Sequence, residues 1–229
     1  MTYLTLDELE EKTENKPFEP RWAYVLLGAM HFFGILGLSY PPLRPIFESM
    51  IPIHLMSSFF LLIHVSPLFP IKFYVALVVV GFFGYLAELI GVKSGIIFGD
   101  YFYVTNLGPH FYNVPILIGL NWILLSFPTL YVVKKYLPKQ KTVVQLALGA
   151  LIMVLIDVLI EPFAIEHEMW AWVNDTPPLH NYLGWFAVAF GILAFMNRFF
   201  PKHNNFFAVF LLVNQILFFG IHYLVHLFI

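Results

Sequence analysis

The sequence predicts an all-α membrane protein, a polytopic bundle of about seven transmembrane helices with a re-entrant or interfacial segment. The 229 residues are 60% hydrophobic and only 11% charged, whereas a soluble domain has roughly 25% charged residues. The apolar residues also fall into runs of roughly 20, the length that a helix needs to cross a bilayer. Because these runs fill most of the chain, we expect one transmembrane domain over residues 21–229, preceded by a polar tail over residues 1–20.

Seven apolar runs are separated by prolines, glycines and polar residues, which are typical of helix ends and loops. The second run is the shortest, because Pro52 and Pro67 limit it. In order, the expected spans are Trp22–Ser39, Ile51–Ser66, Ile71–Val92, Val114–Val133, Val143–Phe163, Tyr182–Phe199 and Phe206–Phe228.

Two connections between these spans have an unusual composition. Gly91–Tyr112 is too polar and glycine-rich for a span, yet too apolar for a solvated loop. A re-entrant or interfacial segment fits, provided that its backbone packs against protein. Glu166–His180 carries two tryptophans, a residue typical of the membrane interface. We expect these aromatic segments to meet over one end of the bundle, with Phe98–Tyr103 touching Trp170–Trp185.

Positive charges predict the orientation, because short cytoplasmic loops are rich in Lys and Arg. With seven spans, the N-terminal tail and the second, fourth and sixth loops share one side. Of the 12 Lys and Arg residues, that side holds all except Arg44 and Lys93. The sequence therefore predicts a multi-pass protein of the cell membrane with its N-terminus in the cytoplasm and its C-terminus outside.

The composition excludes several classes of site. A formal net charge of −2 gives no basis for binding nucleic acid. With no cysteine, the chain cannot form disulfides or iron–sulfur clusters or use a catalytic thiolate. His222 and His226 have the i, i+4 spacing of two metal ligands on one helix face. A full ligand set is not evident around them, so we expect no metal.

Three carboxylates lie inside the apolar spans: Glu88, Asp157 and Glu161. A charge in hydrocarbon is costly, so an intramembrane acid is a functional-site hypothesis by default. Asp157 and Glu161 are four residues apart and share a helix face. In such a pair one carboxyl can hold its proton and act as a general acid, while the other accepts a proton from water. A proton-coupled transporter uses intramembrane acids equally well and stays an alternative.

The acids belong to two ordered motifs. The first reads Glu88-x-x-Gly91-x-x-Ser94-Gly95-x-x-Phe98-Gly99-Asp100-Tyr101-Phe102-Tyr103, then Val114-Pro115 and Trp122. The second reads Asp157-x-x-x-Glu161-Pro162, then Trp170-Ala171-Trp172, Pro178 and Asn181-Tyr182-x-Gly184-Trp185. Over residues 84–185 this ordered set resembles the membrane carotenoid hydratases, the family of the bisanhydrobacterioruberin hydratases and gamma-carotene hydratases.

The resemblance implies an enzyme that adds water to the terminal double bond of an acyclic carotenoid end group, giving a tertiary alcohol without a cofactor. It places Asp157, Glu161 and Glu88 in catalytic roles and makes the substrate a membrane lipid. The residues expected to bind carotenoid are Asp100, Tyr101, Tyr103, Trp170, Trp172, Asn181 and Trp185. A carotenoid cyclase or isomerase, which forms the same cation without capturing water, stays an alternative, as does a carotenoid-binding protein.

Overall fold

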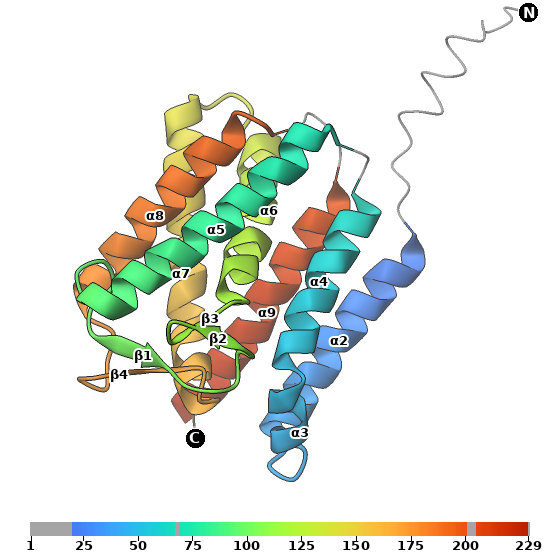
Figure 1. The fold of residues 1–229 in the computed structure, drawn as a ribbon. Coiled ribbons are helices and arrows are strands. Elements are labelled where there is room, and N and C mark those ends of the chain that lie inside the picture. The colour runs from blue at the N-terminus through green and yellow to red at the C-terminus, as the bar shows by residue number, and fades with distance from the viewer. Residues whose placement is uncertain (1–19, 67–68, 201–204, 229) are drawn as a thin grey trace, which may run out of the picture.

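The computed structural model describes residues 20–66, 69–200 and 205–228, which form a helical bundle with short strands at one end (Figure 1). The predicted polar tail, with Lys12 and Lys16, lies outside the described residues, apart from Pro20. The helices are α2 (Arg21–Ser39), α3 (Arg44–Ser49), α4 (Ile51–Val65), α5 (Ile71–Ser94), α6 (Ile118–Tyr136), α7 (Thr142–Glu166), α8 (Leu179–Asn197) and α9 (Phe206–Phe228). The strands are β1 (Tyr101–Tyr103), β2 (His110–Phe111), β3 (Val114–Pro115) and β4 (Trp170–Trp172).

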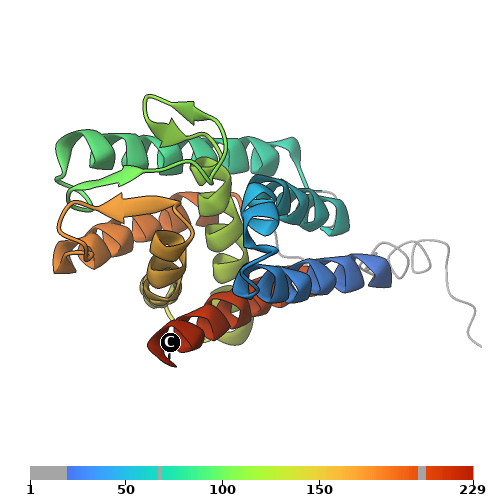
Figure 2. The same cartoon turned by 90° about the horizontal axis from the view of Figure 1, so that it is seen from below.

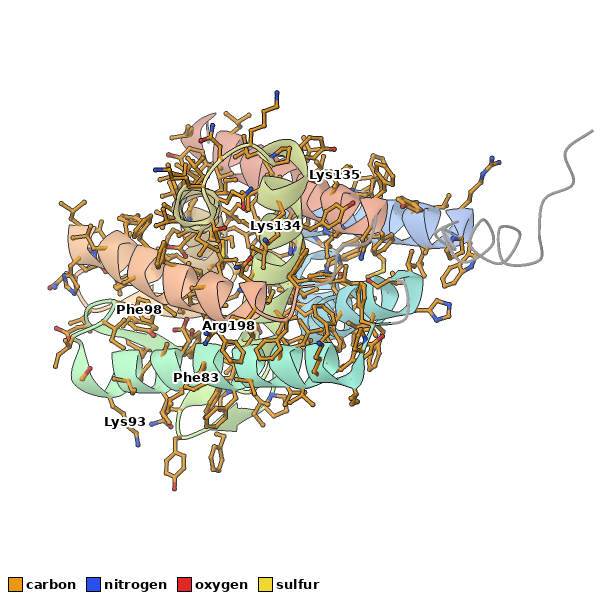
Figure 3. The ribbon with its side chains drawn as sticks, turned by 90° about the horizontal axis from the view of Figure 1, so that it is seen from above. Phe83, Lys93, Phe98, Lys134, Lys135 and Arg198 are labelled. Carbon is orange, nitrogen blue, oxygen red and sulfur yellow. The ribbon has the colours of Figure 1, made fainter. Side chains whose placement is uncertain are left out.

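Seven of these helices coincide with the seven predicted spans, which confirms the all-α membrane bundle. Five of them, α2, α5, α7, α8 and α9, are long and apolar enough to cross a membrane. The expected start of the fourth span at Val114 is wrong, because Val114 and Pro115 form β3 and α6 begins at Ile118. Exposed apolar side chains such as Phe83 of α5 cover the outside of the bundle (Figure 3).

Helix α6 lies in the middle of the bundle, where it contacts α4, α5, α7, α8 and α9 (Figure 2). Of its 19 residues, 13 are buried, including Trp122, Phe127 and Leu130. Close approach to α5 is possible because Gly119 faces the backbone of Gly81. The centre of the protein is therefore packed against protein on several sides, and a polar group placed there is shielded from lipid.

Strands β1 and β4 join the two aromatic segments that we expect, from the sequence, to lie in contact. β1 pairs antiparallel with β4, so that Tyr101 lies opposite Trp172 and Tyr103 opposite Trp170 (Figure 1). β2 and β3 form a second antiparallel pair. The expected contact between Phe98–Tyr103 and Trp170–Trp185 is confirmed. The segment that follows Gly91 completes α5 and then covers the end of the bundle, where it forms β1.

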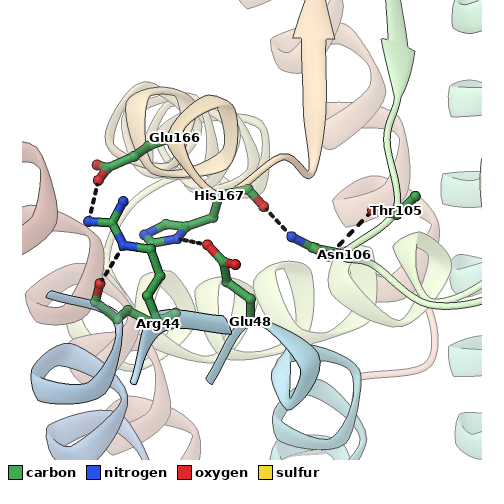
Figure 4. A network of polar contacts seen from close by, with 7 residues as sticks. Arg44, Glu48, Thr105, Asn106, Glu166 and His167 are labelled. Carbon is green, nitrogen blue, oxygen red and sulfur yellow. Dashed lines mark hydrogen bonds and ion pairs between the residues drawn. The ribbon is translucent and has the colours of Figure 1, made fainter. Parts of the chain in front are cut away.

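Polar contacts hold the connection between α2 and α4 against the end of the bundle that carries the strands (Figure 4). Arg44, at the start of α3, pairs with Glu166, at the end of α7, at 2.9 Å. Glu48 of α3 lies 2.8 Å from Nδ1 of His167, and Asn106 donates a hydrogen bond to the backbone oxygen of His167. Three segments that are distant in sequence thus meet at the end of the helix that carries Asp157 and Glu161.

Basic residues gather at the opposite end of the bundle. Figure 3 looks down on this end, where Lys134 and Lys135 close α6 and Arg198 follows α8. Arg44 and Lys93 lie at the end that carries the strands, at the start of α3 and in the last turn of α5. The two ends therefore differ in charge as the sequence predicts, and the three acids lie toward the end with few basic residues.

Candidate active site

Helices α5 and α7 bring the three intramembrane acids to one place, on the bundle side of the strands. Glu88, Asp157 and Glu161 are 3%, 1% and 5% exposed, so none of them is solvated by bulk water. All three line the same cavity of about 20 Å³. A space of this size holds about one water molecule. The structure thus brings acids from two helices to one site.

Glu88 is held by three hydrogen-bond donors. The hydroxyl groups of Tyr101 and Tyr103 donate to Oε2 at 2.6 and 2.8 Å. The indole Nε1 of Trp122 donates to Oε1 at 3.0 Å. The two tyrosines reach the same acid because alternate residues of a strand point to the same side, and Trp122 comes from α6. Both oxygens of Glu88 are therefore occupied, and each contact uses the carboxyl as an acceptor.

The two tyrosines of β1 keep their protons in this position. Burial raises the pKa of Tyr101 and Tyr103, and the nearby negative charge of Glu88 raises each pKa further. A phenol whose pKa lies above its ordinary value stays neutral over a wider pH range. Both hydroxyl groups thus remain donors to Glu88 at every pH at which the protein is expected to work.

Glu161 is held by two tryptophans of β4, which point to the same side because they are alternate residues of a strand. The indole Nε1 atoms of Trp170 and Trp172 donate to its Oε2 at 3.2 and 2.9 Å. A tryptophan in an interfacial belt turns its N–H toward the headgroups and water, whereas these two turn theirs inward to an acid. Both indole groups are therefore turned to the same acid, and both donate to one oxygen of Glu161.

Asp157 has the fewest partners of the three acids. Nδ2 of Asn181, in the first turn of α8, donates to its Oδ2 at 3.2 Å. Its Oδ1 is buried and has no hydrogen-bond partner among the described residues. The number of donors thus falls from three at Glu88 to two at Glu161 and one at Asp157, so that the three carboxyl groups are chemically distinct.

An aromatic wall surrounds the acids. Trp185 of α8 stacks on Trp122 with the ring centroids 4.3 Å apart. Tyr101 packs against Trp172 at 5.2 Å, and Phe98 against Trp185 at 6.2 Å. Of the expected carotenoid-binding residues, the cavity lining includes Tyr101, Tyr103, Trp170, Trp172, Asn181 and Trp185.

The structure does not bring Asp100 into the site. Its side chain is exposed and lies over Gly95 at the end of α5. Asp100 therefore lies outside the lining of the small cavity, and its expected part in binding carotenoid stays a prediction. Phe98 and Asn121, by contrast, line the cavity but are not among the expected binding residues. Both stand in or beside a motif, and an amide next to Trp122 in an apolar span is the available signal for Asn121.

A second and much larger cavity adjoins the acids. It has a volume of about 480 Å³ and is lined mostly by apolar side chains of α2, α4, α6, α7 and α9. Four residues line both cavities: Ile118, Asn121, Ile160 and Trp170. The lining also includes Leu26, Phe33 and Ile53, which are exposed at the surface of α2 and α4. The large cavity thus extends from exposed side chains of α2 and α4 to residues that also line the cavity of the acids.

The histidines are dispersed. Nδ1 of His31 lies 2.9 Å from the carbonyl oxygen of Leu27, and the His31 ring packs on that of His54 in the large cavity. His222 is buried against Phe163, whereas His226 is exposed, so these two do not face a common ligand. Among the described residues, no group of three or more His, Asp or Glu side chains is placed to hold a metal ion.

Comparison with known proteins adds one finding. A family model described as "carotenoid biosynthesis protein" matches residues 50–229. The matched part runs from the start of α4 to the end of the chain, so it contains all three acids and both aromatic strands. No curated protein and no solved structure matches the chain significantly.

Proposed function

Because the chain belongs to the carotenoid biosynthesis protein family, we propose that it is a carotenoid hydratase that adds water to the terminal double bond of an acyclic end group. The observation that supports this most directly is the meeting of the two cavities. A water-sized space bounded by three acids opens beside a large apolar space. Hydration of a hydrocarbon needs both, because one reactant is water and the other is a lipid.

The large cavity is the proposed binding place for the end of the carotenoid. Its volume of about 480 Å³ lies within the roughly 300–1,000 Å³ of small-molecule sites. The substrate would enter from the bilayer between α2 and α4, past the exposed side chains of Leu26, Phe33 and Ile53. Its terminal double bond would then reach Ile118, Ile160 and Trp170, beside the acids, while the rest of the chain stays in apolar surroundings.

Asp157 is the proposed general acid. Hydrogen bonds to a carboxylate favour its charged form, and Asp157 receives only one, so its ionised form gains the least from its surroundings. Its proton would pass to the CH carbon of the terminal double bond, and a C–H bond would form from the alkene electron pair. The adjacent carbon, which carries two methyl groups, becomes a tertiary cation, and Asp157 becomes a carboxylate.

Glu161 is the proposed base. Its Oε2 is fixed by two tryptophans, and the cavity beside it has room for a water molecule. As the water oxygen bonds to the cationic carbon, one water proton would pass to Glu161. The product is a tertiary alcohol, and proton transfer from Glu161 to Asp157 restores the starting state. No electrons are gained or lost, so the steps need no redox cofactor.

Glu88 and the aromatic wall would stabilise the cation rather than transfer protons. Glu88 already accepts three hydrogen bonds, more than Asp157 or Glu161 accepts among the described residues, so it is the acid that is least available to water. Its role is to hold the strand and α6 together and to contribute negative charge near the reacting end. The faces of Trp172 and Trp185, which line the small cavity, would add cation–π attraction, which grows when a cation is desolvated.

Expression in a bacterial host that makes lycopene tests the proposal. Pigments extracted from these cells should gain the mass of one water per hydrated end, as measured by mass spectrometry. An unchanged mass with an altered absorption spectrum would instead support a cyclase or isomerase. Unaltered pigment would contradict any carotenoid-modifying activity and favour the binding or proton-transport alternatives.

The orientation gives a prediction about accessibility. We expect the end with Lys134, Lys135, Lys139 and Lys141 to face the cytoplasm, because Lys and Arg gather in cytoplasmic loops. In this cysteine-free chain, Lys139→Cys should resist a membrane-impermeant thiol reagent in intact cells, whereas Asp175→Cys should react. Labelling in the reverse order would show that the protein is inserted the other way round.

Chelation gives a second prediction. The proposed steps are proton transfers between carboxyl groups, water and an alkene, so we expect EDTA or a phenanthroline to leave hydration unchanged in washed membranes. A loss of activity that zinc or iron restores would show that a metal takes part and would contradict the mechanism. Addition of magnesium serves as the control for non-specific effects on the membrane.

A further inference from the structure

Asn121 of α6 lies where the two cavities meet. It is one of four residues that line both of them, with Ile118, Ile160 and Trp170. The two isoleucines have no polar side-chain atoms, and the N–H of Trp170 is already donated to Glu161. Asn121 is therefore the only shared lining residue with an uncommitted polar side-chain group in the described part of the chain.

The amide of Asn121 makes no side-chain hydrogen bond among the described residues, although the residue is partly buried. Its amide nitrogen and oxygen also keep some accessible surface, because neither is one of the fully buried polar atoms without a hydrogen-bond partner. An amide in this condition offers one acceptor and two donor positions to whatever occupies the cavities. The residue that follows, Trp122, is fixed by its bond to Glu88, so the position of Asn121 is fixed as well.

A water molecule in the small cavity needs two to four polar partners. Oδ1 of Asp157 has no partner among the described residues, and Glu161 uses only Oε2 in the observed bonds. These two acids lie on α7, so on their own they would hold the water on one side only. The amide of Asn121 supplies a partner from α6, on the side that faces the apolar cavity.

We propose that Asn121 is a positioning residue that holds the attacking water at the boundary between the two cavities. This inference rests on the proposed hydratase function. The cation formed by proton transfer from Asp157 has two fates: the water oxygen bonds to it, with a proton passing to Glu161, or it returns a proton to a carboxylate and becomes an alkene again. Asn121 would favour the first fate by keeping the water in line with the cationic carbon.

The ratio of these fates is measurable in deuterated water. Membranes that contain the protein are loaded with lycopene in D₂O, and mass spectrometry then separates alcohol from lycopene that has gained deuterium without oxygen. In Asn121→Leu, the ratio of alcohol to deuterated lycopene should fall about tenfold, a fold-change within reach of one lost hydrogen bond. Asn121→Ser, which retains a hydroxyl, should recover part of the ratio.

Asn214→Leu is the matched control, because among the described residues the side chain of Asn214 bonds only to the Phe210 carbonyl of its own helix, and Asn214 lines neither cavity. It should keep the wild-type ratio. An unchanged ratio in Asn121→Leu, or loss of both products in Asn121→Leu and Asn121→Ser alike, would overturn the positioning role, because either result indicates packing alone. If wild-type protein gives neither alcohol nor deuterated lycopene, the hydratase function itself fails, and the inference falls with it.

Discussion

Asp157→Asn and Glu161→Gln should each nearly abolish hydration while leaving the protein folded and inserted. Both substitutions keep the shape of the side chain and remove the group that transfers the proton. General acid–base groups typically contribute about 10²–10⁴-fold each, and here protonation of the alkene is an obligatory step. The measurement is the yield of tertiary alcohol from lycopene, normalised to the amount of protein in the membrane.

Glu166→Gln provides a matched control on the same helix. Glu166 is a partly exposed carboxylate that pairs with Arg44 outside the cavity, so this variant should hydrate lycopene as the wild type does. Substantial hydration by Asp157→Asn would remove Asp157 from the role of acid, and the same result for Glu161→Gln would remove Glu161 from the role of base. Hydration by both variants would contradict the carboxyl-pair mechanism.

Much of the fold is predictable because the bilayer imposes strong constraints. Apolar runs of span length account for seven helices, and the high cost of a buried charge singles out Glu88, Asp157 and Glu161 from the sequence alone. The four-residue spacing of Asp157 and Glu161 also fixes their common helix face. These inferences use only local sequence, and the structure places all three acids together.

The strand pairing lies beyond the reach of such local reasoning. β1 and β4 are three residues long, too short to show a periodic pattern. Their pairing depends on helix packing that is distant in sequence, since α8 contacts both α5 and α7. The register of Tyr101 opposite Trp172 decides which indole and phenol groups reach which acid. Sequence can therefore name the aromatic residues but not their division between Glu88 and Glu161.

The placement of Asp100 and Asn121 lies beyond local sequence for the same reason. The motif groups Asp100 with its neighbours, but only the backbone turn at Gly99 decides that its carboxyl points outward. Asn121 is easily passed over, because an uncharged amide in a span is a weaker signal than a carboxylate. Its place between the two cavities follows only from the three-dimensional linings, which share it.

A single methyl group at Gly184 should disrupt the site as severely as the loss of an acid. Gly184 lies on α8, where a Cβ atom would overlap the backbone oxygen of Ile97 and lie 3.1 Å from the ring of Phe98. A backbone oxygen cannot rotate away as a side chain can, so α8 must move. Because α8 also carries Asn181 and Trp185, the same movement would pull the amide from Asp157 and open the aromatic wall.

Gly184→Ala should therefore lower stability by about 1–3 kcal/mol, the typical cost of overpacking, and hydration should fall with it. The thermal unfolding midpoint of the purified protein in detergent and the alcohol yield in membranes measure the two effects. Gly191→Ala, on the same helix, is the matched control, because a Cβ atom there meets nothing within 4 Å. That variant should be neutral or slightly stabilised, since Ala favours helix over Gly by about 1 kcal/mol. Equal midpoints and yields for the two variants would show that the contact between α8 and Ile97 does not hold the site together.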